Sequence, residues 1–170
     1  AARNFANKIW NASRYMLMNL EGADDAFVPE ESDYTLADRW ILTRSAETVR
    51  TVTANLEHYE LGEAGRAIYE FVWSEFCDWY IEMVKPRLWN KEDPTREAAL
   101  WTLREVLSRA LKLLHPFMPF ITEEVFLSLN EEDSIMVSPW PVEEARFVFP
   151  EDAVEVERVK DAVREIRRIR

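Results

Sequence analysis

Glycine, cysteine and histidine are scarce in this chain of 170 residues, which has three, one and two of them. The lone cysteine, Cys77, excludes an internal disulfide and favours a reducing, cytoplasmic setting. His58 and His115 lie far apart and match no metal-ligand spacing, so no metal is expected. No apolar run approaches the roughly 20 residues that a membrane-spanning helix needs. The first ten residues also lack the apolar core of a signal peptide.

Sequence signatures of catalysis are missing as well. The chain has no glycine-rich phosphate loop, no nucleophile with a recognisable base and no zinc motif. Strand patterns are hard to find, whereas 48% of the residues are hydrophobic and many recur at helical spacing. We therefore expect an all-α helical bundle of about five to six helices, with no catalytic residue and no cofactor of its own.

The segment from Leu61 to Leu88 organises this prediction. Two adjacent apolar rows run along it at helical spacing, which predicts a helix that is buried on most sides. Cys77 and Trp79 belong to these rows, so both are expected to pack in the core. Pro86 lacks a backbone N–H and disfavours helix in the preceding residue, so the helix should end or bend there.

Other helices are expected around this central one, at residues 3–20, 36–60, 95–115 and 120–129. The bundle is predicted to span residues 1–150. A last helix, 151–170, continues to the final residue without a stop signal. We interpret it as a truncated helix that leads toward a missing C-terminal region of a longer protein.

The charge is unevenly distributed. A formal net charge of −11 argues against a general nucleic-acid binder, which needs a basic surface. Residues 1–20, however, contain three cations and no acid, and a second basic cluster closes the chain. The cations at the two ends are Arg3, Lys8 and Arg14, then Arg164, Arg167, Arg168 and Arg170. Local anion binding at either end therefore stays open.

The first helix has an unusual polar face. At about 100° per residue, one side collects the apolar residues Phe5, Ile9, Ala12, Met16 and Leu20. The opposite side contains Asn4, Asn7, Lys8, Asn11, Arg14 and Tyr15. Asparagine is a poor helix former but both donates and accepts hydrogen bonds, while cations and an aromatic ring suit phosphates and unpaired bases. We expect Tyr15 to point away from the core. The residues favour RNA contact and docking against another domain about equally.

Several motifs resemble one family. The stretches are ARNFANKIWNASR, WSEFCDWYIEMVKPRL, ALKLLHPFMPFITEEVF and SIMVSPWP. Together they are similar to the anticodon-binding helical domain of class I aminoacyl-tRNA synthetases, in the isoleucyl, leucyl and valyl branch. Within that branch, FCDWYIEMVKPRL and the closing VREIRRIR most resemble valyl-tRNA synthetases. The resemblance covers essentially the whole chain.

The resemblance implies a non-catalytic part of a valine–tRNA ligase. Its partners would be the anticodon stem-loop of valine tRNA and the missing catalytic and C-terminal regions of the same polypeptide. ATP would be used by the catalytic region, whose HIGH- and KMSKS-type motifs are absent here. Alternatives are the equivalent domain of an isoleucyl or leucyl enzyme, or a helical docking domain that binds no RNA.

The resemblance also assigns residues. Lys8, Asn11, Arg14 and Tyr15 match positions that are expected to face the anticodon, and many relatives have phenylalanine where Tyr15 stands. Arg3 and Asn4 are weaker candidates for the same contact. Helical periodicity places all six of these residues except Arg3 on the polar face of the first helix, so the periodicity and the resemblance agree on this surface.

Overall fold

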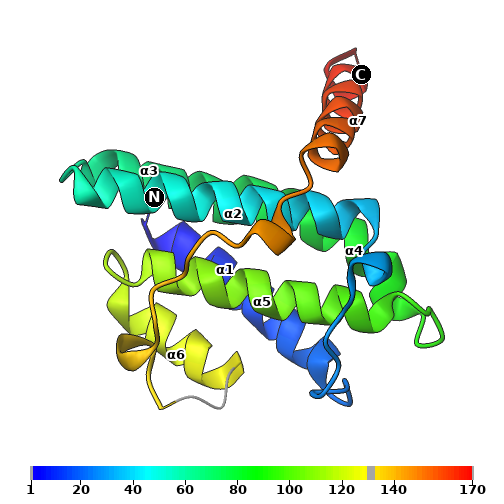
Figure 1. Ribbon diagram of the computed structural model, residues 1–170, viewed down its shortest axis with the longest axis horizontal. Coiled ribbons are helices and arrows are strands. Elements are labelled where there is room, and N and C mark those ends of the chain that lie inside the picture. Colours follow the sequence, from blue (N-terminus) through cyan, green and yellow to red (C-terminus); the bar gives the residue numbers. More distant parts are fainter. Residues whose placement is uncertain (1, 130–132, 170) are drawn as a thin grey trace.

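The computed structural model describes residues 2–129 and 133–169, and it confirms the all-α class (Figure 1). Within that range there is no strand. The helices are α1 (Ala2–Leu20), α2 (Leu36–Glu57), α3 (Leu61–Glu70), a π-helix η2 (Phe71–Tyr80), α4 (Ile81–Trp89), α5 (Arg96–Leu114), α6 (Pro119–Leu129) and α7 (Pro150–Ile169). Short 3-10 turns occupy η1 (Glu31–Asp33), η3 (Ile135–Val137) and η4 (Ala145–Phe147).

The segments α3, η2 and α4 follow one another without a break and form the expected central helix. Its middle is π-helical: the N–H of Ile81 donates to the carbonyl of Phe76, five residues back. A π-helix turns each residue by less than the ~100° of an α-helix. Side chains after residue 71 therefore face directions that differ from those that α-helical periodicity predicts.

Trp79 shows the effect of this winding. Phe76, in the same predicted row, is fully buried, but Trp79 is only half-buried. Trp79 therefore packs against the core as predicted, but it is only partly buried and not among the fully buried side chains that its row predicts. Cys77 does pack as predicted: it is buried, and burial raises the pKa of its thiol to about 12.

Of the two alternatives at Pro86, an end of the helix is not observed, because α4 continues to Trp89, one residue beyond the predicted Leu88. The proline removes one backbone hydrogen bond, but the next residues fix the last turn. Leu88 is buried. Arg87 donates to both carboxylate oxygens of the fully buried Asp38 in α2, at 2.8 and 2.9 Å. These tertiary contacts outweigh the local preference of proline.

The core lies between α2, the central helix and α5. Trp40, Tyr80 and Phe126 are among its largest fully buried side chains. The hydroxyl of Tyr80 donates to Asp38 at 2.6 Å, so this carboxylate, the one that is buried among the described residues, is fully hydrogen-bonded. Helix α1 packs across one side of this core, against η2, α5 and α6.

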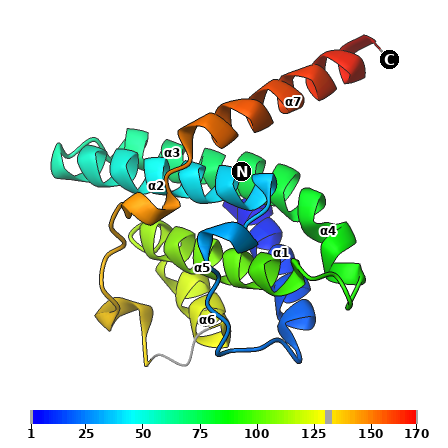
Figure 2. The same cartoon turned by 45° about the vertical axis from the view of Figure 1, so that its right-hand side comes forward.

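The first half of α7 packs on α2, and its second half does not. Ala153 and Val156 belong to the same hydrophobic core as the rest of the bundle. Trp40 donates its indole N–H to Glu157 at 2.9 Å. Beyond Lys160 the described side chains of α7 are exposed apart from a half-buried Val163, and both views show this end rising away from the bundle (Figures 1 and 2).

Candidate RNA-binding surface

Helix α1 has one face in the core. Phe5, Ile9 and Met16 are at most 3% exposed, as their helical spacing predicts. Ser13 lies on the same side, and its hydroxyl donates to the carbonyl of Ile9 at 2.7 Å. Burial of this face fixes the rotation of the helix and decides which of its side chains reach solvent.

The exposed face of α1 is a continuous polar row, which we call the α1 stripe. It consists of Arg3, Asn4, Asn7, Trp10, Asn11 and Arg14, all of them exposed. Arg3 and Arg14 have no ion-pair partner among the residues that the structure describes. The structure therefore brings four of the six predicted site residues together on one open surface: Arg3, Asn4, Asn11 and Arg14.

Trp10 is the member of the stripe that periodicity overlooked. It is 42% exposed, which is unusual for the largest apolar side chain. It lies three residues after Asn7 and four before Arg14, and residues at these spacings are neighbours on a helix surface. The signal in the sequence was an aromatic residue outside the apolar arc of an amphipathic helix.

Lys8 lies at the edge of the stripe and is already engaged. Its ammonium is 2.6 Å from a carboxylate oxygen of Asp78 and 3.8 Å from the ring centroid of Trp73, both in η2. The side chain is 23% exposed. Lys8 therefore ties α1 to the central helix, and its charge is offset by a neighbouring acid.

Tyr15 does not point away from the core, so that expectation is wrong. The ring is half-buried and packs against the core, and the ammonium of Lys85 lies 5.8 Å from its centroid. Its hydroxyl is buried and has no hydrogen-bond partner among the described residues. Tyr15 sits at the border between the apolar and polar faces of α1, and the neighbouring central helix covers that border.

An aromatic cluster holds the start of α1 in place. Phe5 lies 4.5 Å from the ring of Tyr69, and Tyr69 stacks on Trp73 at 5.7 Å. The ammonium of Lys8 covers Trp73. Two aromatic contacts and a cation–π contact thus fix the N-terminal turns of the stripe.

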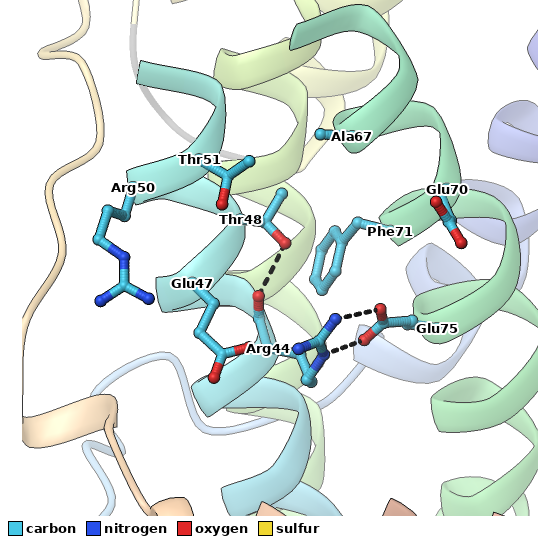
Figure 3. A pocket seen from close by; sticks show the side chains of 9 residues that line it. All are labelled: Arg44, Glu47, Thr48, Arg50, Thr51, Ala67, Glu70, Phe71 and Glu75. Carbon is cyan, nitrogen blue, oxygen red and sulfur yellow. Dashed lines mark hydrogen bonds and ion pairs between the residues drawn. The ribbon is translucent and has the colours of Figure 1, made fainter. Parts of the chain in front are cut away.

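A polar hollow of about 290 Å³ lies between α2 and the central helix (Figure 3). Arg44 forms two hydrogen bonds with Glu75, at 2.7 and 2.8 Å, and also pairs with Glu47. The hydrogen bonds to Glu75 raise the pKa of the Arg44 guanidinium. Because these charges satisfy one another, we interpret the hollow as a structural ion-pair site.

The described part of the chain contains no group of three or more His, Cys, Asp or Glu side chains that could hold a metal ion. None of the helices in that part is long and apolar enough to cross a bilayer. The Nδ1 atom of His115 lies 2.7 Å from the hydroxyl of Thr122. That contact joins the end of α5 to α6.

Residues 38–170 match the family described as the anticodon-binding domain of tRNA ligase. Because the match covers most of the chain, the chain belongs to this family. More specifically, it is similar to enzymes named valine–tRNA ligase, across nearly all of its length, α1 included. Identity is 52% for that of Carboxydothermus hydrogenoformans over 99% of this chain, 45% for Clostridium tetani and 46% for Geobacillus stearothermophilus over 100%.

The chain spans 19% of the length of each of these relatives. Among solved structures, it is similar to LeuRS of Agrobacterium radiobacter K84 in a ternary complex with tRNA and LeuAMS. The TM-score is 0.60, with 22% identity, and the match covers 88% of this chain and 17% of the other. This likeness supports the fold.

Proposed function

We propose that this chain is the anticodon stem-loop-binding domain of a valine–tRNA ligase. It would position valine tRNA for aminoacylation by a catalytic region that lies elsewhere in a longer polypeptide. ATP would be bound by that region, and this domain would hold no cofactor. The family match and the valine–tRNA ligases that resemble the whole chain support this proposal. Translation in the cytoplasm agrees with the single, buried cysteine.

The main observation in favour of RNA binding is the α1 stripe. A net acidic chain presents three asparagines, two arginines without acidic partners among the described residues, and a 42% exposed tryptophan on one face. Exposed helix faces are ordinarily filled with better helix formers than asparagine. The composition of this face therefore reflects what it contacts and contributes little to folding.

The stripe offers the chemistry that an RNA loop needs. Unpaired bases stack on aromatic rings, and their edges form hydrogen bonds with groups that both donate and accept, such as Asn7 and Asn11. Trp10 supplies the stacking plane. Arg14 supplies a phosphate contact that is not already neutralised. In this proposal Lys8 and Tyr15 mainly support the surface, since both pack against the central helix.

One alternative function is protein docking: the chain would be a helical docking domain that binds no RNA. The open, cationic stripe favours RNA over an apolar protein interface. Domains of isoleucyl or leucyl enzymes are the other alternative. Relatives named valine–tRNA ligase, at 45–52% identity over this chain, favour valine. The similarity to LeuRS at 22% identity bears on the fold alone.

The test is binding of the 170-residue chain, at low salt, to anticodon stem-loops that carry valine, isoleucine or leucine anticodons. We expect the valine stem-loop to bind most tightly. Trp10→Ala should cost ~1–3 kcal/mol, the usual contribution of one stacked base. Arg14→Gln should weaken binding of all three RNAs, because a phosphate contact carries no sequence information. Arg66→Gln, on α3 and 71% exposed, is the matched control.

Each outcome bears on one alternative. Weaker binding of the valine stem-loop by the Trp10→Ala chain, with Arg66→Gln unchanged, supports contact between α1 and the anticodon loop. A preference for the isoleucine or leucine stem-loop would assign the chain to a sister enzyme. Absence of any RNA binding at low salt would refute the proposal and favour a docking role for the stripe.

A further inference from the structure

Three cations of α7 converge on one tryptophan of the central helix. Lys160 Nζ lies 5.5 Å from the ring centroid of Trp79, and the guanidinium carbons of Arg164 and Arg167 each lie 5.7 Å from it. We call these four residues the α7 cluster. It is separate from the α1 stripe and from the polar hollow of Figure 3, neither of which includes any of them.

Lys160 has a structural role that explains its position. It is 2% exposed, donates to Glu157 at 2.9 Å and lies 4.5 Å from the ring of Trp40. Glu157 also accepts the indole N–H of Trp40. These contacts attach the first half of α7 to α2, and they fix where the following turn of the helix places its side chains.

Arg164 and Arg167 have no comparable role in stability. Arg164 is 52% exposed and pairs with Asp161, itself 68% exposed, and such surface pairs contribute little. Arg167 is exposed and has no ion-pair partner in the described part of the chain. Residues three apart on a helix are neighbours, so the two like charges repel each other. The helix dipole favours cations near this end, but it does not explain why both converge on Trp79.

The α7 cluster and α1 lie on the same stretch of the central helix. Trp79 follows Asp78 directly, and Asp78 is the residue that pairs with Lys8 of α1. Helix α7 reaches this stretch through its contacts with Trp79, and its C-terminal end rises from the bundle (Figure 2). One extended polyanion could therefore contact both helices.

We propose that the α7 cluster binds the phosphate backbone of the RNA as a second contact, beside the α1 stripe. An arginine that lies over an aromatic ring keeps its N–H groups available for phosphate oxygens, in a pre-ordered position. Exposed cations over a half-buried ring, on the half of α7 that leaves the core, fit a ligand that is charged and extended. The ligand's identity as RNA rests on the proposed function above.

The test is the salt dependence of RNA binding by the full chain. For each phosphate contact, the slope of log affinity against log salt changes by ~0.7–0.9. The variant Arg164→Gln/Arg167→Gln should therefore lose ~1.4–1.8 from the slope. Between 200 and 50 mM salt, wild-type affinity should then rise ~7- to 12-fold more than that of the variant.

Arg66→Gln/Arg158→Gln is the matched control. It also removes two exposed cations, one from α3 and one from the face of α7 opposite the cluster. Both double variants should keep the wild-type circular dichroism, because the four side chains are exposed. We expect the control to change the slope by less than the cluster variant does.

An unchanged slope in the cluster variant, or an equal change in the control, would overturn the proposal and point to an acidic protein as the partner of α7. Arg14→Gln separates this failure from failure of the proposed function. If Arg14→Gln weakens binding and the cluster variant does not, only the α7 site is refuted. If RNA binds without preference for the valine stem-loop, the proposed specificity fails, while the salt slope still tests the cluster.

Discussion

Arg87 is predicted to be the most important charged residue for stability. Its side chain is 12% exposed and that of Asp38 is 0% exposed. Besides its two hydrogen bonds to Asp38, it donates to the hydroxyl of Thr35 and to the hydroxyl and carbonyl of Thr95, at 3.0, 2.8 and 2.6 Å. Arg87 thus joins the end of α4 to the residues that precede α2 and α5. Replacement by methionine keeps the apolar stem and removes all five hydrogen bonds.

The expected loss of unfolding free energy follows from the state of Asp38 after Arg87 is replaced. In the Arg87→Met chain, the carboxylate of Asp38 stays buried with only Tyr80 and the N-cap residue Thr35 as donors. Breaking a buried ion pair on one side costs ~3–5 kcal/mol, because the other charge is left uncompensated. At ~2–4 °C per kcal/mol for a chain of this size, the melting temperature should fall by ~6–20 °C.

The assay is urea unfolding followed by far-ultraviolet circular dichroism, with the melting temperature as a second measure. Arg66→Met removes an exposed arginine that pairs with the exposed Glu63, and should leave both unchanged. Asp38→Asn combined with Arg87→Met should recover part of the loss, because no buried charge then remains unpaired. A cost below ~1 kcal/mol for Arg87→Met would refute the argument that the pair secures the helix beyond Pro86.

Three further predictions concern stability. Tyr15→Phe should stabilise the chain by ~1 kcal/mol, because it removes a buried hydroxyl without a partner among the described residues. Tyr15→Ala should cost ~2 kcal/mol, about half the usual value for a fully buried ring; no loss in urea unfolding would mean that the ring faces solvent. Burial alone would raise the pKa of Glu157, but hydrogen bonds from Lys160 and Trp40 outweigh it and lower that pKa. The stability that Glu157 provides should therefore be present above its unfolded pKa of about 4.5 and be lost as the pH falls through the lower folded value. Unfolding midpoints between about pH 5 and 3 should fall more steeply for the wild type than for Glu157→Gln, with Glu155→Gln as control; equal slopes would contradict this.

Local periodicity was sufficient for much of α1. Phe5, Ile9 and Met16 were placed in the core from their spacing alone, and the structure confirms this. Tyr15 was placed wrongly because it lies at the border of the apolar arc. At such a border the next helix in space decides whether a side chain is covered, and that helix is distant in the sequence.

The central helix shows a second limit of periodicity. Its existence and its approximate ends follow from the two apolar rows, but its π-helical middle does not. The change in winding leaves Phe76 in the core and turns Trp79 toward α7. The persistence of the helix beyond Pro86 likewise depends on Asp38, 49 residues away in the chain. Neither effect is visible in the local sequence.

Net charge was the least informative property for function. Many of the cations pair within the fold, as Arg44 and Arg87 do with buried or half-buried acids. Such pairs neutralise each other and leave the surface field to the remaining exposed groups. Arg14 on α1 and Arg167 on α7 are exposed and have no ion-pair partner within the described residues, so each presents a local positive charge on an acidic protein.

The positions of these two charges matter more than their number. They belong to helices that flank the same part of the central helix, around Asp78 and Trp79. A single phosphate contact would fix neither the register nor the orientation of a stem-loop. Contacts from two helices would restrict both, and this would leave Trp10 and the asparagines of the α1 stripe to contact the bases. Discrimination among anticodons should therefore depend on α1, whereas the salt dependence of binding should depend on both helices.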